Sequence, residues 1–189
     1  GNSQFDSGVS YRVWNGSRFS VEMNITLTDG TGITMNNYTD FVMLFPQPKT
    51  DNIMALMANT SLGLYAVPWT GNSFDRSNAL ILTNTSADNT QQHFAFAWEQ
   101  QSGEGLAVYG ATAAIPTLEI RTYSSTSGWG AASTITNAMA GGVAELRLCA
   151  DAESDYIGMI FQSAGEIVNV SMWNGSQILN SRFNTRIST

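Results

Sequence analysis

Residues that could act as general acids or bases are sparse in this chain, and His93 is the only histidine among its 189 residues. A Ser-His-Asp triad would have to use His93, and a His-rich zinc site would need several such residues. His93 directly precedes the apolar run 94–98, which places it at a predicted strand end. We therefore expect no catalytic residues and no zinc site.

Three carboxylates alternate along one short segment, at Asp151, Glu153 and Asp155. In an extended backbone alternate side chains lie on the same side, and calcium prefers oxygen ligands. A calcium loop would also require Gly at its sixth position and Glu at its twelfth, and the sequence has neither. The pattern favours a solvated hairpin turn, so we expect no metal and no cofactor.

Aromatic side chains are the remaining candidates for ligand contact, because they can stack on sugar rings. Trp129 lies in an irregular segment, 124–130, of the kind in which binding residues concentrate. Together with Tyr123 and Arg121, it forms the ligand-binding set that the sequence predicts.

These residues belong to a gapless repeat with a period of 52 residues. The apolar stretch 42–45 recurs at 94–97 and 146–149, and the stretch 55–57 recurs at 107–109 and 159–161. Trp69 and Trp173 are two periods apart, and a turn containing Gly follows each of them. In the middle copy Arg121 stands where Trp is expected, and we predict that Tyr123 takes the aromatic role two residues later. A period near 50 residues, made of strand-length apolar runs, indicates repeated sheet units.

Each repeat divides into four strands of an antiparallel meander, with about 10 to 13 residues per strand and turn. Residues 11–17 match residues 170–176, which form a third strand and its turn, so the chain begins with half a unit. We predict a single domain over 1–189, with a half unit at 9–30 and full units at 38–87, 90–139 and 143–189.

This unit resembles a β-propeller blade, with an aromatic residue closing the third strand and an apolar residue five positions later. The pairs are Trp14 and Phe19, Trp69 and Phe74, and Trp173 and Ile178. The form is similar to blades of secreted bacterial and sialidase-like surface propellers. The resemblance implies an all-β propeller or propeller segment of about 3.5 four-stranded antiparallel blades, and a β-sandwich is the alternative fold. It also implies three ways to complete a ring: a larger parent chain, self-association of copies, or a compact four-bladed ring.

A sialidase-like site would combine carboxylates with an arginine cluster and a tyrosine. Arginines are present at Arg12, Arg121 and Arg147, but they do not recur at one blade position, and the sialidase Asp-box is absent. A glycoside hydrolase is therefore the weaker alternative, and we expect that the protein is not an enzyme.

Composition limits the partners. Charged residues make up 12% of the chain, its net charge is −7, and it has a single lysine. This balance argues against nucleic acid and against an anionic membrane surface. No run of 18 apolar residues occurs, so we expect no membrane insertion.

Low lysine content, many Asn and Thr residues, and seven Asn-x-Ser/Thr triplets favour an extracellular or cell-surface location. Cys149 is the only cysteine, and we expect its thiol to pack as a small apolar group. The sequence thus predicts a non-enzymatic extracellular binding or structural module. Its alternative is a glycan-binding lectin, and its expected partners are a glycan or another surface protein.

Overall fold

The computed structural model describes residues 9–25, 39–59, 63–85, 92–111, 117–135, 143–163, 167–179 and 185–186. These residues form sixteen β-strands and one short 3-10 helix, η1 (Arg76–Asn78). In the part of the chain so described, no helix is long and apolar enough to cross a bilayer. The expected all-β fold is confirmed.

The strands form three antiparallel sheets of four or five strands and one pair. We call the sheets blades 1 to 3, and the pair β1 (Val9–Tyr11) and β2 (Met23–Ile25) the half-blade. Blade 1 contains β3 (Thr39–Pro46), β4 (Asn52–Asn59), β5 (Leu64–Thr70) and β6 (Leu80–Thr83). Blade 2 contains β7 (Phe94–Trp98), β8 (Gly105–Gly110), β9 (Leu118–Ser124), β10 (Gly128–Trp129) and β11 (Ser133–Ile135). Blade 3 contains β12 (Val143–Ala150), β13 (Ile157–Ser163), β14 (Ile167–Trp173), β15 (Ile178–Leu179) and β16 (Thr185–Arg186).

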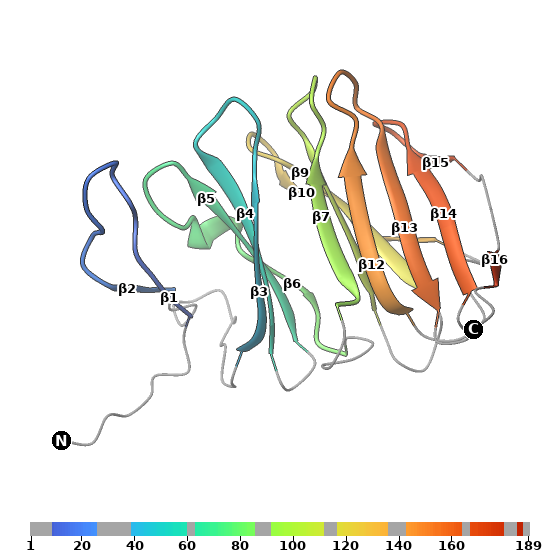
Figure 1. Cartoon of the computed structure of the whole chain (residues 1–189), viewed down its shortest axis with the longest axis horizontal. Coiled ribbons are helices and arrows are strands. Elements are labelled where there is room, and N and C mark those ends of the chain that lie inside the picture. The colour runs from blue at the N-terminus through green and yellow to red at the C-terminus, as the bar shows by residue number, and fades with distance from the viewer. Residues whose placement is uncertain are drawn as a thin grey trace.

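The sheets lie side by side in chain order, from the half-blade at one end to blade 3 at the other (Figure 1). Each pair of neighbouring sheets encloses its own apolar layer. The layer between the half-blade and blade 1 contains Ile25 and Val67, and the layer between blades 1 and 2 contains Leu56 and Phe96. The layer between blades 2 and 3 contains Leu106. Strands β4, β5, β7 and β8 are apolar on both faces because both faces of these strands meet a neighbouring sheet. The alternative β-sandwich is therefore wrong, since a sandwich has two facing sheets around one core.

Strand register explains the irregular middle copy. Trp69 pairs with Ile53 and Trp173 pairs with Ile157, whereas Gly105, the equivalent of both partners, pairs with Tyr123. Tyr123 therefore occupies the tryptophan position, and the prediction from the sequence is confirmed. Arg121 lies two residues before Tyr123, so the two side chains point to the same face of β9, because side chains alternate between the faces of a strand.

The turn after each third-strand tryptophan also follows the repeat. Trp14 bridges Phe19 and Trp69 bridges Phe74, as the five-residue spacing predicts. The side chain of Asn15 accepts hydrogen bonds from two backbone N–H groups further along the turn, and Asn174 does the same in blade 3. The glycine that follows each asparagine has a φ near +90°, a backbone conformation that residues other than glycine rarely adopt.

One packing expectation fails. Cys149 is exposed, because its side chain lies on the face of blade 3 that no further sheet covers among the described residues. Ile160, Val170 and Met172 are exposed as well. An apolar strand sequence predicts burial, but it does not reveal which blade stands at the end of the array.

Candidate functional site

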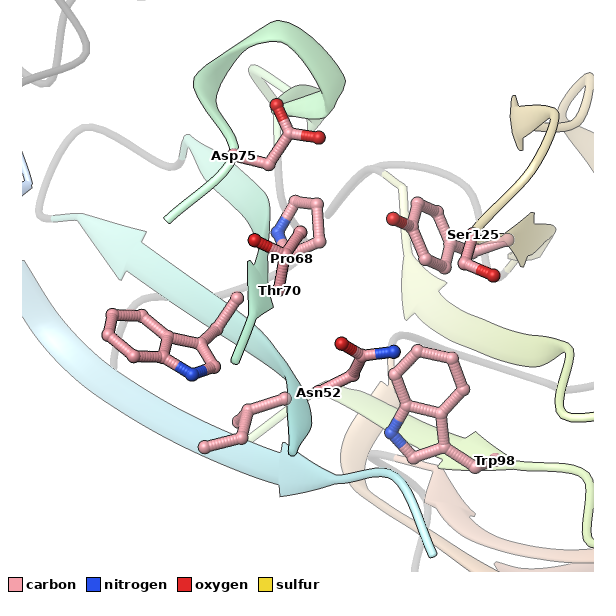
Figure 2. Close-up of a pocket in the computed structure, with 9 residues that line it drawn as sticks. Asn52, Pro68, Thr70, Asp75, Trp98 and Ser125 are labelled. Carbon is pink, nitrogen blue, oxygen red and sulfur yellow. The ribbon is translucent and has the colours of Figure 1, made fainter. Parts of the chain in front are cut away.

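A pocket of about 210 Å³ opens between blades 1 and 2, and we call it the inter-blade pocket. Figure 2 shows residues from both blades pointing into it. Its lining consists of Asn52, Ile53, Pro68, Trp69, Thr70, Asp75, Trp98, Tyr123 and Ser125. It is smaller than the roughly 300–1,000 Å³ of pockets for drug-sized ligands, so it suits a ligand about as large as one sugar ring.

Blade 1 supplies the polar wall of the pocket. Asn52 begins β4, Thr70 ends β5, and the two residues pair across the strands. The Asn52 side chain donates a hydrogen bond of 2.8 Å to the side-chain oxygen of Gln47. Gln47 is buried and donates across the blade boundary to the carbonyl oxygen of Gly103, at 2.7 Å. The polar wall is therefore tied to the neighbouring blade before any ligand binds.

Blade 2 supplies the aromatic wall. Trp98 ends β7, and its ring centroid lies 6.0 Å from that of Tyr123 at an angle of 75°. The Trp98 indole N–H donates to the carbonyl oxygen of Phe45 in blade 1, at 2.8 Å. Gly105 on β8 pairs with Trp98 on one side and with Tyr123 on the other. A Cβ atom at Gly105 would overlap the ring of Phe96. Glycine is thus required at this position so that the aromatic cluster can pack.

Asp75 places a negative charge at the rim of the pocket. Its carboxylate accepts hydrogen bonds from Ser77 and Asn78 in η1, and those bonds hold the pKa of Asp75 below its usual 3.8. Burial, and to a lesser degree the charge of Asp75, raises the pKa of the Tyr123 hydroxyl above 10.0. At neutral pH the pocket therefore presents an ionised carboxylate from blade 1 beside a neutral phenol from blade 2.

The structure brings two of the three sequence-predicted ligand residues together. Trp129 lies on β10 and its ring centroid is 5.0 Å from that of Tyr123. The indole N–H of Trp129 donates to the carbonyl oxygen of Asn78 at 3.0 Å, so Trp129 links blade 2 to η1. Among the three, Tyr123 lines the inter-blade pocket, and Trp129 packs behind it.

Arg121 points toward the same blade boundary but makes different contacts. Its guanidinium donates to the carbonyl oxygen of Gly130 at 3.1 Å and to the hydroxyl oxygen of Tyr109 at 3.3 Å. The Tyr109 hydroxyl in turn donates to Glu119 at 3.0 Å. This arrangement secures the turn that carries Trp129 rather than placing a cation in the pocket.

The boundary between blades 2 and 3 uses a different set of residues. Glu99 is buried and accepts the indole N–H of Trp173 at 2.6 Å and the hydroxyl of Ser102 at 2.5 Å. Asp155 accepts two backbone N–H groups from the turn of blade 2, at 2.8 and 3.0 Å. Asp155 therefore acts as a cap for the neighbouring turn. No cluster of three or more potential metal ligands occurs within the described ranges.

Sequence reasoning missed Trp98 and Asp75 as pocket residues. The residues one period away from Trp98 are Pro46 and Ala150, so the repeat does not account for an aromatic side chain there. That mismatch could have identified Trp98. No comparable signal marks Asp75, because only the fold shows that its turn faces the next blade.

An aromatic wall opposite hydroxyl, amide and carboxylate groups suits a small, uncharged, hydroxyl-rich ligand. Aromatic faces contact the C–H surface of a sugar, while carboxylate and amide oxygens accept its hydroxyl protons. The described lining contains no lysine or arginine. Its chemistry therefore favours neutral sugars over anionic ones.

Among the comparisons with known proteins, the one with solved structures supports the fold. No protein-family model and no curated protein matches the sequence. Among solved structures, the chain is similar to the SapL1 lectin in complex with α-methyl fucoside, with a TM-score of 0.55 and 14% identity over 95% of this chain and 57% of that one. It is also similar to AofleA from Arthrobotrys oligospora, with a TM-score of 0.56 and 14% identity over 95% of this chain and 50% of that one.

A third similar structure is Aleuria aurantia lectin with α-methyl-L-fucoside. Its TM-score is 0.50 and its identity 11%, over 78% of this chain and 46% of the lectin. These neighbours are lectin β-propellers, so the fold is a β-propeller segment. The chain spans about half the length of each neighbour.

Proposed function

We propose that this chain is a glycan-binding module that holds one neutral sugar unit in the inter-blade pocket. The observation that supports this most directly is the pairing of an aromatic wall, Trp98 and Tyr123, with the carboxylate of Asp75 across a blade boundary. The structural neighbours add support, because SapL1 and Aleuria aurantia lectin were solved with a methyl fucoside. Fucosides are therefore the first ligands to test.

Each pocket residue has a role in this proposal. Trp98 and Tyr123 pack against the apolar face of the sugar, and Asp75 accepts a hydroxyl proton. Trp129 holds the Tyr123 ring in place through their contact, and Arg121 fixes the turn that carries Trp129. Replacing any of these three predicted residues should therefore weaken binding, most strongly at Tyr123.

The carboxylate gives the sharpest test. Asp75→Asn keeps the size of the side chain, and its amide oxygen can still accept the backbone N–H groups of Ser77 and Asn78, because Asn caps helices as well as Asp does. It gives up the hydrogen bond from the Asn78 side-chain amide. We expect the substitution to weaken sugar binding about 10- to 100-fold, since a hydrogen bond to a charged group contributes about 1.5–3 kcal/mol. Asp155→Asn is the matched control, because Asp155 also caps a turn at a blade boundary but lies outside the pocket.

A glycan array first identifies the sugars that bind. Isothermal titration with α-methyl fucoside then measures the affinity of both variants and of the unaltered chain. Equal affinity of Asp75→Asn and the unaltered chain would contradict the assigned role of the carboxylate. Absence of binding to every neutral sugar on the array would overturn the proposed function.

Binding without turnover is the favoured activity. Hydrolysis of glycosides generally uses two carboxyl groups, whereas the described lining of the pocket has one, Asp75. A sialidase-like hydrolase is accordingly the second candidate. Release of product from chromogenic glycosides would favour it over a lectin.

We also propose an extracellular or cell-surface setting, in which the partner is a glycan or a glycosylated surface protein. Self-association to complete a ring is part of this proposal. Trp14 and Phe19 are exposed at one end of the array, and Val170 and Met172 are exposed at the other. Light scattering tests it, and a monomer over a wide concentration range would count against it.

A further inference from the structure

Two apolar side chains on β3 are exposed although their equivalents in the other blades are covered. Val42 is 48% exposed, while Phe94, its equivalent 52 residues later, is fully buried. Leu44 is 56% exposed, while its equivalent Phe96 is 2% exposed. The equivalent faces of β3 and β7 are thus both apolar, but only the face of β7 is covered.

The covering elements explain this difference. In blade 2, Phe94 and Phe96 pack against β3 and β4, the first two strands of the preceding blade. Blade 1 is preceded by the half-blade, which supplies third- and fourth-strand equivalents. Those strands cover Met57, Tyr65 and Val67 but leave the β3 face open. The open area therefore corresponds to the position that a hairpin of the first and second strands occupies in a complete blade.

Strand β1 of the half-blade has one edge to which no described strand is paired. In the complete blades, the third strands β5, β9 and β14 each pair with a second strand on one side. The equivalent strand β1 pairs only with β2 among the described residues. No described strand pairs with its other edge, and the backbone groups of such an edge can template the addition of a strand.

We propose that this surface, formed by Val42, Leu44 and that edge of β1, is a docking site for a β-hairpin of the blade type. The hairpin adds its second strand to β1 and covers Val42 and Leu44 with a face of small and medium apolar residues. Blade 2 shows the required chemistry: its β7–β8 hairpin places Ala95 and Leu106 against blade 3, where they help to cover Leu146.

The probe is a synthetic peptide of residues 92–111, which copies the β7–β8 hairpin. Phe94, Phe96 and Trp98 are each replaced by Thr in the peptide, so that the face turned away from the docking site is polar. Binding is measured by isothermal titration, and hydrogen exchange follows the backbone amides of β1. We expect one peptide to bind per chain and to protect amides of residues 9–11 from exchange.

Variants at the two ends of the array test the location. Val42→Asp/Leu44→Asp should weaken peptide binding at least about tenfold, because each buried aliphatic side chain contributes about one order of magnitude or more to binding. Ile160→Asp is the control, because Ile160 in blade 3 is 47% exposed, close to the 48% of Val42, but lies at the opposite end of the array. The control should bind the peptide unchanged. Circular dichroism verifies that both variants are folded.

Three outcomes would overturn the proposal. The first is no binding of the peptide to the unaltered chain. The second is binding that the control variant loses and Val42→Asp/Leu44→Asp retains. The third is a concentration-dependent dimer that disappears in Val42→Asp/Leu44→Asp, because a second copy of the chain would then cover the surface in place of a hairpin.

Discussion

The buried contact between Glu99 and Trp173 offers a quantitative test of how blades 2 and 3 are held together. Glu99→Ala removes the acceptor for the Trp173 indole N–H and for the Ser102 hydroxyl. Each hydrogen bond to a charged group contributes about 1.5–3 kcal/mol, and a buried N–H without a partner adds a cost of about 1–3 kcal/mol. Removing a buried charge offsets part of this loss. We therefore expect the free energy of unfolding to fall by about 2–4 kcal/mol.

Glu99→Gln separates hydrogen bonding from charge. Its amide oxygen can still accept the Trp173 N–H, and glutamine is the natural residue at Gln47, the equivalent position in blade 1. The expected loss is about 1 kcal/mol, since neutral hydrogen bonds contribute less than charged ones.

Urea unfolding of both variants is followed by tryptophan fluorescence and circular dichroism. If the dependence of the unfolding free energy on urea concentration is unchanged, the shift of the midpoint gives the change in stability. A Glu99→Ala loss below about 0.5 kcal/mol would refute the account, because that is the effect of an ordinary surface substitution. Equal losses in Glu99→Ala and Glu99→Gln would show that the charge, rather than the hydrogen bond, stabilises the boundary.

Three further predictions concern blade 2. Gly105→Ala should lower stability by about 1–3 kcal/mol, because its methyl group overlaps Phe96, and thermal unfolding measures the loss. Burial raises the pKa of Tyr109 to about 12, so its neutral form stabilises the fold fully below pH 10 and this contribution is lost as the pH rises from 10 to 12. In Tyr109→Phe, the unfolding free energy should therefore depend less on pH in that window, and an unchanged slope would contradict the assignment. Trp129→Phe removes the hydrogen bond to Asn78 and should cost about 0.5–1.5 kcal/mol in urea unfolding, with weaker sugar binding in the same titration as the Asp75 variants.

The repeat made the architecture predictable. A 52-residue step fixes which residues share a strand position, and it led to Tyr123 as the substitute for a tryptophan two residues late. The Gly-containing turns after Trp14, Trp69 and Trp173 were predictable for the same reason, because local backbone geometry selects Gly.

The pocket was less predictable, because it lies between units rather than within one. Asp75 and Trp98 come from different blades, and their proximity depends on how the sheets are placed against each other. The exposure of Cys149 was likewise hidden, because the sequence of a strand carries no sign that its blade is the last. Sequence thus identifies the unit, while the boundaries between units decide where a ligand can bind.

The tryptophan indole resonances provide the most direct test of sugar binding in the inter-blade pocket. In a titration with α-methyl fucoside, followed by ¹H–¹⁵N correlation spectra, we predict that the Trp98 indole signal shifts, because the Trp98 ring lines the pocket on the side of blade 2. The signals of Trp14, at the end of the array, and of Trp173, bound to Glu99, should stay unchanged. Shifts at Trp14 or Trp173 without any at Trp98 would contradict this location for the sugar, and no shift at saturating fucoside would contradict binding of this ligand.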